Sequence, residues 1–291
     1  MRKYYIIIYW LLISSAISVS WECSNQKIEL QTAQSQNVDF LIEQAKLFWE
    51  QRSDSNAVIK ANYFLGLANK IEKNNFGLSN FYSRSLFFQG MFLESDKIKK
   101  DSLFLKGAEV AKYSIINDSL FKSILNKTIG DYNFKILSAL SIAPKELVPG
   151  MYWWATNKLW YLNNKPAIER VNHRELLEII MHRIISIEPD YFYGGPYRFF
   201  GIFYSRIPGV EITQSKSYFE KATSSHPDYL GNKVQLSEFY HQKAENRNLF
   251  HNQLQSIINI DPTINPEIIP ENIFYQKRAV HLLNQEETLF E

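Results

Sequence analysis

Apolar residues recur at helical spacing along most of the chain, most regularly in its carboxy-terminal half. Phe200, Gly201 and Tyr204 fall on one face of a predicted helix. Phe219 and Ala222 share a face of the next predicted helix. No stretch alternates apolar and polar residues strictly enough to predict a strand. The pattern therefore predicts an all-α protein.

Three short turns that contain proline divide this half into units of nearly constant length. Pro227 follows Pro189 by 38 residues, and Pro262 follows Pro227 by 35. A period of about 34 residues is typical of tetratricopeptide (TPR) repeats, whose units are stacked helical hairpins. The first unit carries the aromatic and small residues of the TPR pattern: Tyr197, Phe200, Gly201, Tyr204, Ser215, Phe219 and Ala222. We expect TPR-like stacked helical hairpins, arranged as an α-solenoid or bundle.

The same pattern gives the domain organisation. Residues 39–291 are predicted to form a single TPR-like domain, with a looser stack over 39–149 and better-defined repeats over 150–291. The stretch 122–149 fits no repeat, and we expect it to connect two sub-stacks. Three helices are expected towards the carboxy terminus, near residues 232–244, 248–260 and 267–283.

The first residues have the order of an export signal. Two basic residues precede an uncharged apolar run with a Ser- and Ala-rich end, so residues 1–22 are predicted to be a signal peptide. Cys23 follows, where a bacterial lipoprotein carries its acylated residue, and residues 23–38 would link it to the domain. The preceding Ser20-Trp21-Glu22 is a poor lipobox, so cleavage without lipidation and a retained apolar anchor stay open as alternatives. Each of these predicts a protein of the periplasm or cell envelope.

Composition and motifs exclude several classes of function. With 45% hydrophobic and 21% charged residues, the chain is neither disordered nor a polytopic membrane protein. A formal net charge of +2 does not indicate a nucleic-acid partner. The six histidines have no spacing that places two metal ligands on one helical face, and no catalytic or phosphate-binding motif is present. We expect no enzymatic activity, no metal and no cofactor.

An aromatic cluster near the middle of the chain is the first candidate binding feature. Trp153, Asn157 and Trp160 lie at i, i+4 and i+7 and share one face of a predicted helix. Tyr152 and Trp154 lie on adjoining faces. Two indoles and an amide on one face can stack on a ligand and hydrogen-bond to it. Each ring alone is also explained by packing in the core, but a helix with rings on two adjacent faces is hard to bury, so we expect some to line a cleft or an interface.

A second cluster spans residues 191–204, where eight of fourteen residues are aromatic and Arg198 is the only charge. An arginine among rings either receives a carboxylate through two hydrogen bonds or stacks on a ring with its charge in water. Tyr193 and Arg198 therefore join the predicted binding residues. Gly194-Gly195-Pro196 in the same run predicts a tight turn rather than a phosphate cradle.

These runs carry a family resemblance. Residues 191–204, 215–222, 227–231 and 271–283 resemble the TPR lipoproteins of TRAP transporters, the T components of tripartite ATP-independent periplasmic systems. The helix over residues 152–161 is similar to the aromatic helix of that family. The resemblance extends over about 39–283 and is strongest after Met151.

The resemblance implies a lipid-anchored, extracytoplasmic, non-enzymatic protein that forms a trimer with a hydrophobic pore and a cleft. It implies docking of the periplasmic solute-binding protein and membrane contact through the lipid anchor only. From the aromatic clusters we expect handover of an apolar solute into an aromatic-lined cleft, away from water. The chain departs from the family at residues 210–214, which replace a Gly-Gly-Asp-like loop, and in its lipobox. A TPR scaffold for envelope assembly and a glycan-binding lipoprotein are the alternatives.

Overall fold

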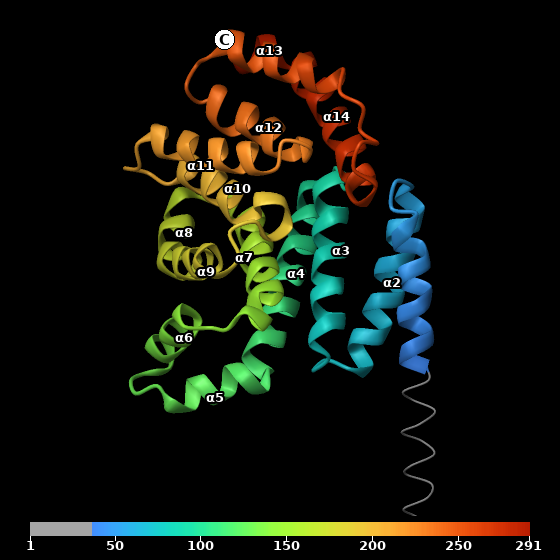
Figure 1. The fold of residues 1–291 in the computed structure, drawn as a ribbon, viewed down its shortest axis with the longest axis vertical. Helices are drawn as coiled ribbons and strands as arrows, with labels where there is room; N and C mark the ends of the chain where they lie inside the picture. The colour runs from blue at the N-terminus through green and yellow to red at the C-terminus, as the bar shows by residue number, and fades with distance from the viewer. Residues whose placement is uncertain (1–36) are drawn as a thin grey trace, which may run out of the picture.

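The computed structural model describes residues 37–291, and these residues form helices joined by short connections (Figure 1). No strand occurs in this range, which confirms the all-α prediction. The predicted signal peptide 1–22, Cys23 and nearly all of the predicted linker 23–38 lie outside the described residues. Among the helices of residues 37–291, none is both long enough and apolar enough to span a bilayer.

Neighbouring helices pack in pairs, and the pairs follow one another along the molecule. A helix over residues 37–50 packs on the second helix through Val38, Leu41, Ala45, Leu65 and Ala68. The paired helices are α2 (Ser55–Ile71) with α3 (Phe76–Phe92), α3 with α4 (Lys97–Asn117), α7 (Val148–Asn163) with α9 (Arg174–Ile187), α10 (Tyr191–Arg206) with α11 (Ile212–Ser225), and α13 (Arg247–Ile258) with α14 (Ile269–Asn284). Shorter elements complete the fold: α8 (Ala167–Asn172), α12 (Leu230–Leu236) with a π-helical turn at Ser237–His241, α15 (Glu286–Leu289), and 3-10 turns at Lys145–Leu147 and Pro266–Ile268.

The stretch that fits no repeat forms an inserted hairpin of α5 (Ser119–Lys127) and α6 (Tyr132–Ser141). Asp118 caps α5 by accepting a hydrogen bond from the backbone N–H of Leu120 at 2.8 Å, and Asp131 caps α6 in the same way. Helix α5 packs on α4, and α6 packs on α9. The insert therefore connects α4 to α7 from the side, while α4 and α7 pack directly on each other in one continuous stack.

Helix α7 is the central helix of the fold. It packs against α3, α4, α9 and α10 (Figure 1). The approach of α4 is close because Gly107 has no side chain; a Cβ there would lie 2.6 Å from Oδ1 of Asn157. The Asn157 amide donates to the hydroxyl of Ser83 at 3.1 Å, and that hydroxyl donates to the carbonyl of Gly107 at 2.8 Å. Three helices are thus tied together by buried polar contacts.

The first and last parts of the described chain contact each other, and we call this the closure contact. Glu271 of α14 is 2% exposed and accepts hydrogen bonds from Arg52 at 3.0 and 3.2 Å and from Arg84 at 3.3 Å. Beside this ion cluster, Phe274 belongs to an apolar cluster with Trp49 and packs on Phe88 and Phe92. Figure 1 shows the red α14 descending between α3 and the blue amino-terminal helices. The stack therefore curves enough for its two ends to meet.

Candidate functional site

A pocket of about 560 Å³ opens beside the closure contact, and we call it the outer pocket. Its walls come from both ends of the chain and from the start of α10. The lining residues are Trp49, Arg52, Arg84, Asp190, Tyr191, Phe192, Tyr193, His226 and Glu267. The guanidinium carbon of Arg84 lies 5.3 Å from the ring centre of Trp49 and 5.1 Å from that of Phe192. Cationic and aromatic groups are therefore presented together at its surface.

A left-handed turn forms one wall of the outer pocket. Phe192, Tyr193 and Gly194 have φ angles of 48°, 59° and 69° before the right-handed part of α10 begins. Only glycine adopts this conformation freely, and a side chain there costs about 1–2 kcal/mol. Two consecutive aromatic residues have this conformation, so the turn is strained. Contacts with other parts of the chain must therefore stabilise it.

Arg198 holds the left-handed turn from the inside. Its guanidinium donates to the carbonyls of Tyr193 and Phe192 at 3.0 and 3.3 Å, and to Oδ1 of Asn232 at 2.7 Å. It also lies 4.5 Å from the ring centre of Tyr229. The sequence predicted an arginine that stacks with its charge in water or receives a carboxylate. The guanidinium does lie over a ring, but its charge is buried and binds backbone carbonyls instead of an acidic group.

A smaller and narrower space lies behind the turn, and we call it the inner cavity. Its free volume is about 10 Å³, enough for about one water molecule. Its lining residues include Phe87, Tyr152, Thr156, Trp160, Arg198, Phe199, Tyr229, Gln235 and Tyr275. Oγ1 of Thr156 and Oε1 of Gln235 are buried and have no hydrogen-bond partner within residues 37–291. An unpaired buried polar atom is costly, so the cavity is suited to a polar atom of a bound molecule.

Phe192 lies between the outer pocket and the inner cavity. On one side its ring faces Arg84, and on the other its centre lies 4.9 Å from that of Trp153 and 5.7 Å from that of Tyr152. Tyr152 lines the inner cavity, whereas Phe192 lines the outer pocket. The strained turn thus lies between a wide pocket and a narrow aromatic space.

The predicted aromatic residues of α7 lie in the core rather than at an open cleft. Tyr152, Trp153, Trp154, Asn157 and Trp160 are each at most 7% exposed. We expected a helix with rings on two adjacent faces to leave some of them in a cleft or interface. Helices pack around α7 on several sides, so none of the five is exposed at an open cleft, although three of them line interior or surface hollows. Tyr152 and Trp160 line the inner cavity, whereas Trp154 lies at the base of a separate hollow of about 380 Å³ beside α6.

Tyr193 is the predicted residue that reaches the outer pocket. Its ring stacks on Tyr229 with centres 5.2 Å apart, and its hydroxyl donates to Oε2 of Glu267 at 2.9 Å. Burial, the hydrogen bond to Glu267 and the charge of that carboxylate raise the pKa of Tyr193 to about 12. The phenol is therefore a neutral donor at physiological pH.

The other walls of the outer pocket were not predicted from the sequence. Trp49, Arg52 and Arg84 lie far before the aromatic run, and Glu267 lies far after it. No local spacing relates these positions, since only the curvature of the whole stack brings them together. The density of large rings at Phe48, Trp49, Phe81 and Phe88 was the available signal, and it is equally typical of core packing.

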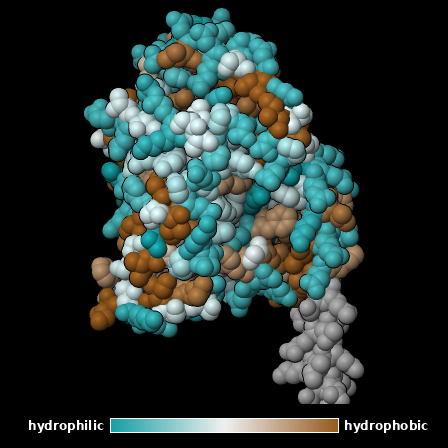
Figure 2. Space-filling view, viewed as in Figure 1, coloured by the Kyte–Doolittle hydropathy of each residue, from teal (hydrophilic) through white to brown (hydrophobic). Residues whose placement is uncertain are grey.

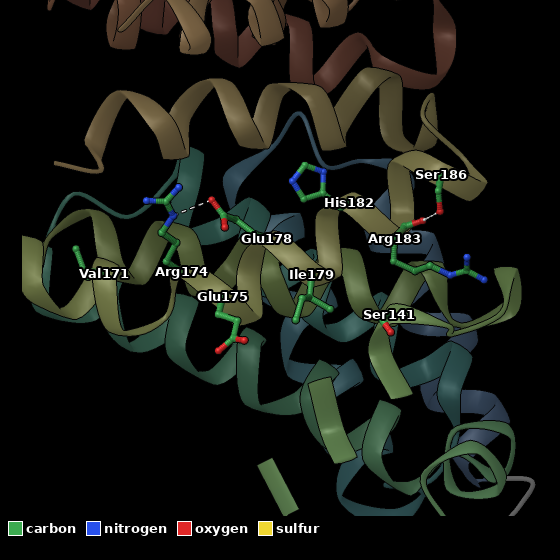
Figure 3. Close-up of a pocket in the computed structure, with 9 residues that line it drawn as sticks. All are labelled: Ser141, Val171, Arg174, Glu175, Glu178, Ile179, His182, Arg183 and Ser186. Carbon is green, nitrogen blue, oxygen red and sulfur yellow. Dashed lines mark hydrogen bonds and ion pairs between the residues drawn. The ribbon is translucent and has the colours of Figure 1, made fainter. Parts of the chain in front are cut away.

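Other hollows lie on the surface. Figure 3 shows one of about 680 Å³ along α9, where Arg174 and Glu178 pair at 2.9 Å and His182 and Arg183 line the wall. Another, of about 730 Å³, lies near the carboxy terminus. Neither contains a predicted binding residue. Within residues 37–291, no three His, Cys, Asp or Glu side chains are grouped so that they would hold a metal ion.

Comparison with known proteins agrees with the resemblance. The family model for the TRAP transporter T-component matches residues 94–290, more than half of the chain, from the start of α4 to the carboxy terminus. No curated protein matches the chain. The chain therefore belongs to the TRAP transporter T-component family.

Proposed function

We propose that this protein docks the periplasmic solute-binding protein of its TRAP transporter at the outer pocket and receives a small ligand in the inner cavity. The observation that carries the proposal is the pairing of these two spaces across the strained turn at Phe192 and Tyr193. Ligand sites combine apolar walls with a few polar groups, and backbone strain concentrates at such sites.

The chemistry of the inner cavity suggests what the ligand is. Rings of Tyr152, Trp160 and Tyr229 favour an apolar body. The unpaired oxygens of Thr156 and Gln235 favour a hydrogen-bond donor at one end of it. We therefore propose an apolar molecule with a hydroxyl, amine or amide end, rather than a fully apolar solute.

Entry requires movement of the turn, since the cavity has room for about one water-sized sphere in this conformation. Rotation of Phe192 towards Arg84 would connect the outer pocket to the inner cavity. If the backbone of Phe192 and Tyr193 also left the left-handed region, its strain would be released, which would lower the cost of opening.

The family places the protein in the cell envelope as part of a transporter. We further propose that it is extracytoplasmic, that Cys23 carries a lipid anchor, and that the protein assembles as a trimer, as the resemblance implies. Handover of a ligand makes and breaks no covalent bond, so the proposed function is non-enzymatic and needs no cofactor.

If the solute-binding protein docks at the outer pocket, removing an aromatic side chain from the pocket wall should weaken its binding. In affinity purification of the tagged full chain from its own envelope, Tyr193→Ala should lower the recovery of the solute-binding protein about tenfold. A contact residue in a desolvated pocket contributes on this scale. Mass spectrometry of the eluate measures the recovery. The control is Tyr197→Ala, because Tyr197 is also half-buried on α10 but does not line the outer pocket.

Equal recovery with both variants would show that the partner docks elsewhere. Recovery of envelope-assembly proteins without any solute-binding protein would favour the scaffold alternative. Retention on immobilised glycans that depends on Trp154 or Tyr161 would favour the glycan-binding alternative.

If a ligand binds in the inner cavity, a substitution at Thr156 should lower ligand affinity without lowering the stability of the protein. Thr156→Val removes an unpaired buried hydroxyl with little change in shape, so the unfolding free energy should stay equal or rise by about 1 kcal/mol. Ligand affinity should fall about fivefold, since one hydrogen bond is lost. The measurement is the amount of organic ligand extracted per mole of purified protein, quantified by mass spectrometry.

Thr223→Val is the matched control for Thr156→Val. Its hydroxyl is also unpaired within residues 37–291, but it lies on α11, away from the inner cavity. If the wild-type protein yields no ligand, or if both variants retain the same amount as the wild type, the inner cavity is not the ligand site.

A further inference from the structure

The tip of the α5–α6 hairpin exposes large apolar side chains to solvent. Ile129 is 89% exposed, Tyr132 62% and Phe134 56%. We call these three residues the tip patch. The backbone between them turns at Gly130 with a φ of 137°, and the Phe134 ring lies so near that a Cβ on Gly130 would be 2.6 Å from it. In Figure 2, hydrophobic surface gathers at the lower left, over the region that α5 and α6 occupy in Figure 1.

Lysines flank the tip patch along the sequence. Lys122, Lys127 and Lys135 lie on or next to the hairpin, against a single acid, Asp131, between residues 119 and 135. The Asp131 side chain is already engaged as the cap of α6, where it accepts from the backbone N–H of Phe134 at 3.0 Å. None of the three lysines forms an ion pair in the part of the chain that the structure describes. The hairpin tip is therefore both apolar and positively charged.

We propose that the tip patch inserts into an anionic lipid surface. Exposed isoleucine and aromatic rings flanked by lysines match the boundary between acyl chains and charged headgroups. The lysines would reach phosphate groups while the three apolar side chains leave water. A protein partner fits less well, because lysine is depleted from the core of protein interfaces.

The position of the hairpin agrees with this role. Along the long axis in Figure 1, α5 lies at the same end of the molecule as the first described residues. Cys23 precedes residue 37 by 14 residues, a length of chain that spans at most about 50 Å. The proposed lipid at Cys23 and the tip patch can thus reach one bilayer. The inference rests on the proposed attachment to a membrane, and it adds a second contact to the anchor.

Photocrosslinking tests this contact in the full chain. The protein carries p-benzoylphenylalanine in place of Ile129 and is reconstituted into vesicles of phosphatidylethanolamine and phosphatidylglycerol at 3:1. The control carries it in place of Leu249, which is 53% exposed on α13 at the opposite end of the molecule. We expect lipid adducts at position 129 and not at 249, detected by the mass of the irradiated protein. In phosphatidylcholine vesicles, or with Lys127→Gln, the adduct yield at 129 should fall about fivefold.

The other outcomes overturn the proposal in distinguishable ways. Adducts between two copies of the chain, or with another protein in envelope membranes, would make the tip patch a protein interface. An anchored chain without lipid adducts at position 129 would refute lipid insertion and leave the proposed docking and ligand binding untouched. Loss of the whole chain from the vesicles would overturn the proposed membrane attachment as well.

Discussion

Arg198→Met should lower the free energy of unfolding by about 3–5 kcal/mol. The Arg198 side chain is buried and donates to the carbonyls of Phe192 and Tyr193, to Asn232 and to the hydroxyl of Tyr152. Methionine fills similar space but leaves these acceptors without their donor. The left-handed turn would also lose the contacts that hold it. Urea denaturation followed by far-ultraviolet circular dichroism measures the change.

Arg206→Met is the matched control for Arg198→Met. Arg206 lies on the same helix and is exposed, so its replacement should change the unfolding free energy by less than 0.5 kcal/mol, as is usual at the surface. If Arg198→Met cost less than about 1 kcal/mol, the guanidinium would not be what holds the turn.

Phe274→Ala should be nearly as destabilising, by about 3–4 kcal/mol. Phe274 lies in the apolar part of the closure contact, with ring centres 5.5 Å from Phe88 and 5.3 Å from Phe92. Truncation leaves a cavity between α3 and α14. In addition to the lower free energy of unfolding, we expect faster hydrogen exchange at the backbone amides of residues 37–50. The helix over these residues contacts α14 through Trp49 and the neighbouring Arg52.

Val280→Ala on the same helix provides the comparison. Val280 is 42% exposed, so its truncation should be close to neutral and leave exchange in residues 37–50 unchanged. Unchanged exchange in that helix with Phe274→Ala would mean that the ion cluster at Glu271 joins the two ends without help from the apolar contact.

Short-range patterns predicted the helices well. The helices expected near residues 248–260 and 267–283 correspond to α13 (Arg247–Ile258) and α14 (Ile269–Asn284). The helix expected near 232–244 ends its α-helical part at Leu236 and continues as a π-helical turn. Helical periodicity and proline turns act over a few residues, so they fix element positions without information on the whole fold.

The candidate site depends on longer-range effects, and there the sequence was less informative. Aromatic density singled out Tyr152, Trp160 and Arg198, which line the inner cavity, and Tyr193, whose carbonyl accepts a hydrogen bond from Arg198. The same density could not tell a cavity wall from the core, because burial of α7 depends on how many helices surround it. The positive φ angles at Phe192 and Tyr193 also have no local signal, since neither residue type favours them.

The origin of the two walls of the outer pocket has an evolutionary consequence. Trp49, Arg52 and Arg84 precede residue 94, where the family match begins, whereas the strained turn and Glu267 lie within it. Substitutions at Trp49 or Arg52 would change one wall of the pocket from outside the matched region, whereas Arg84 also contacts the ring of Phe192 in the turn. A chimaera with a foreign amino-terminal segment would therefore exchange this wall of the outer pocket and keep the strained turn.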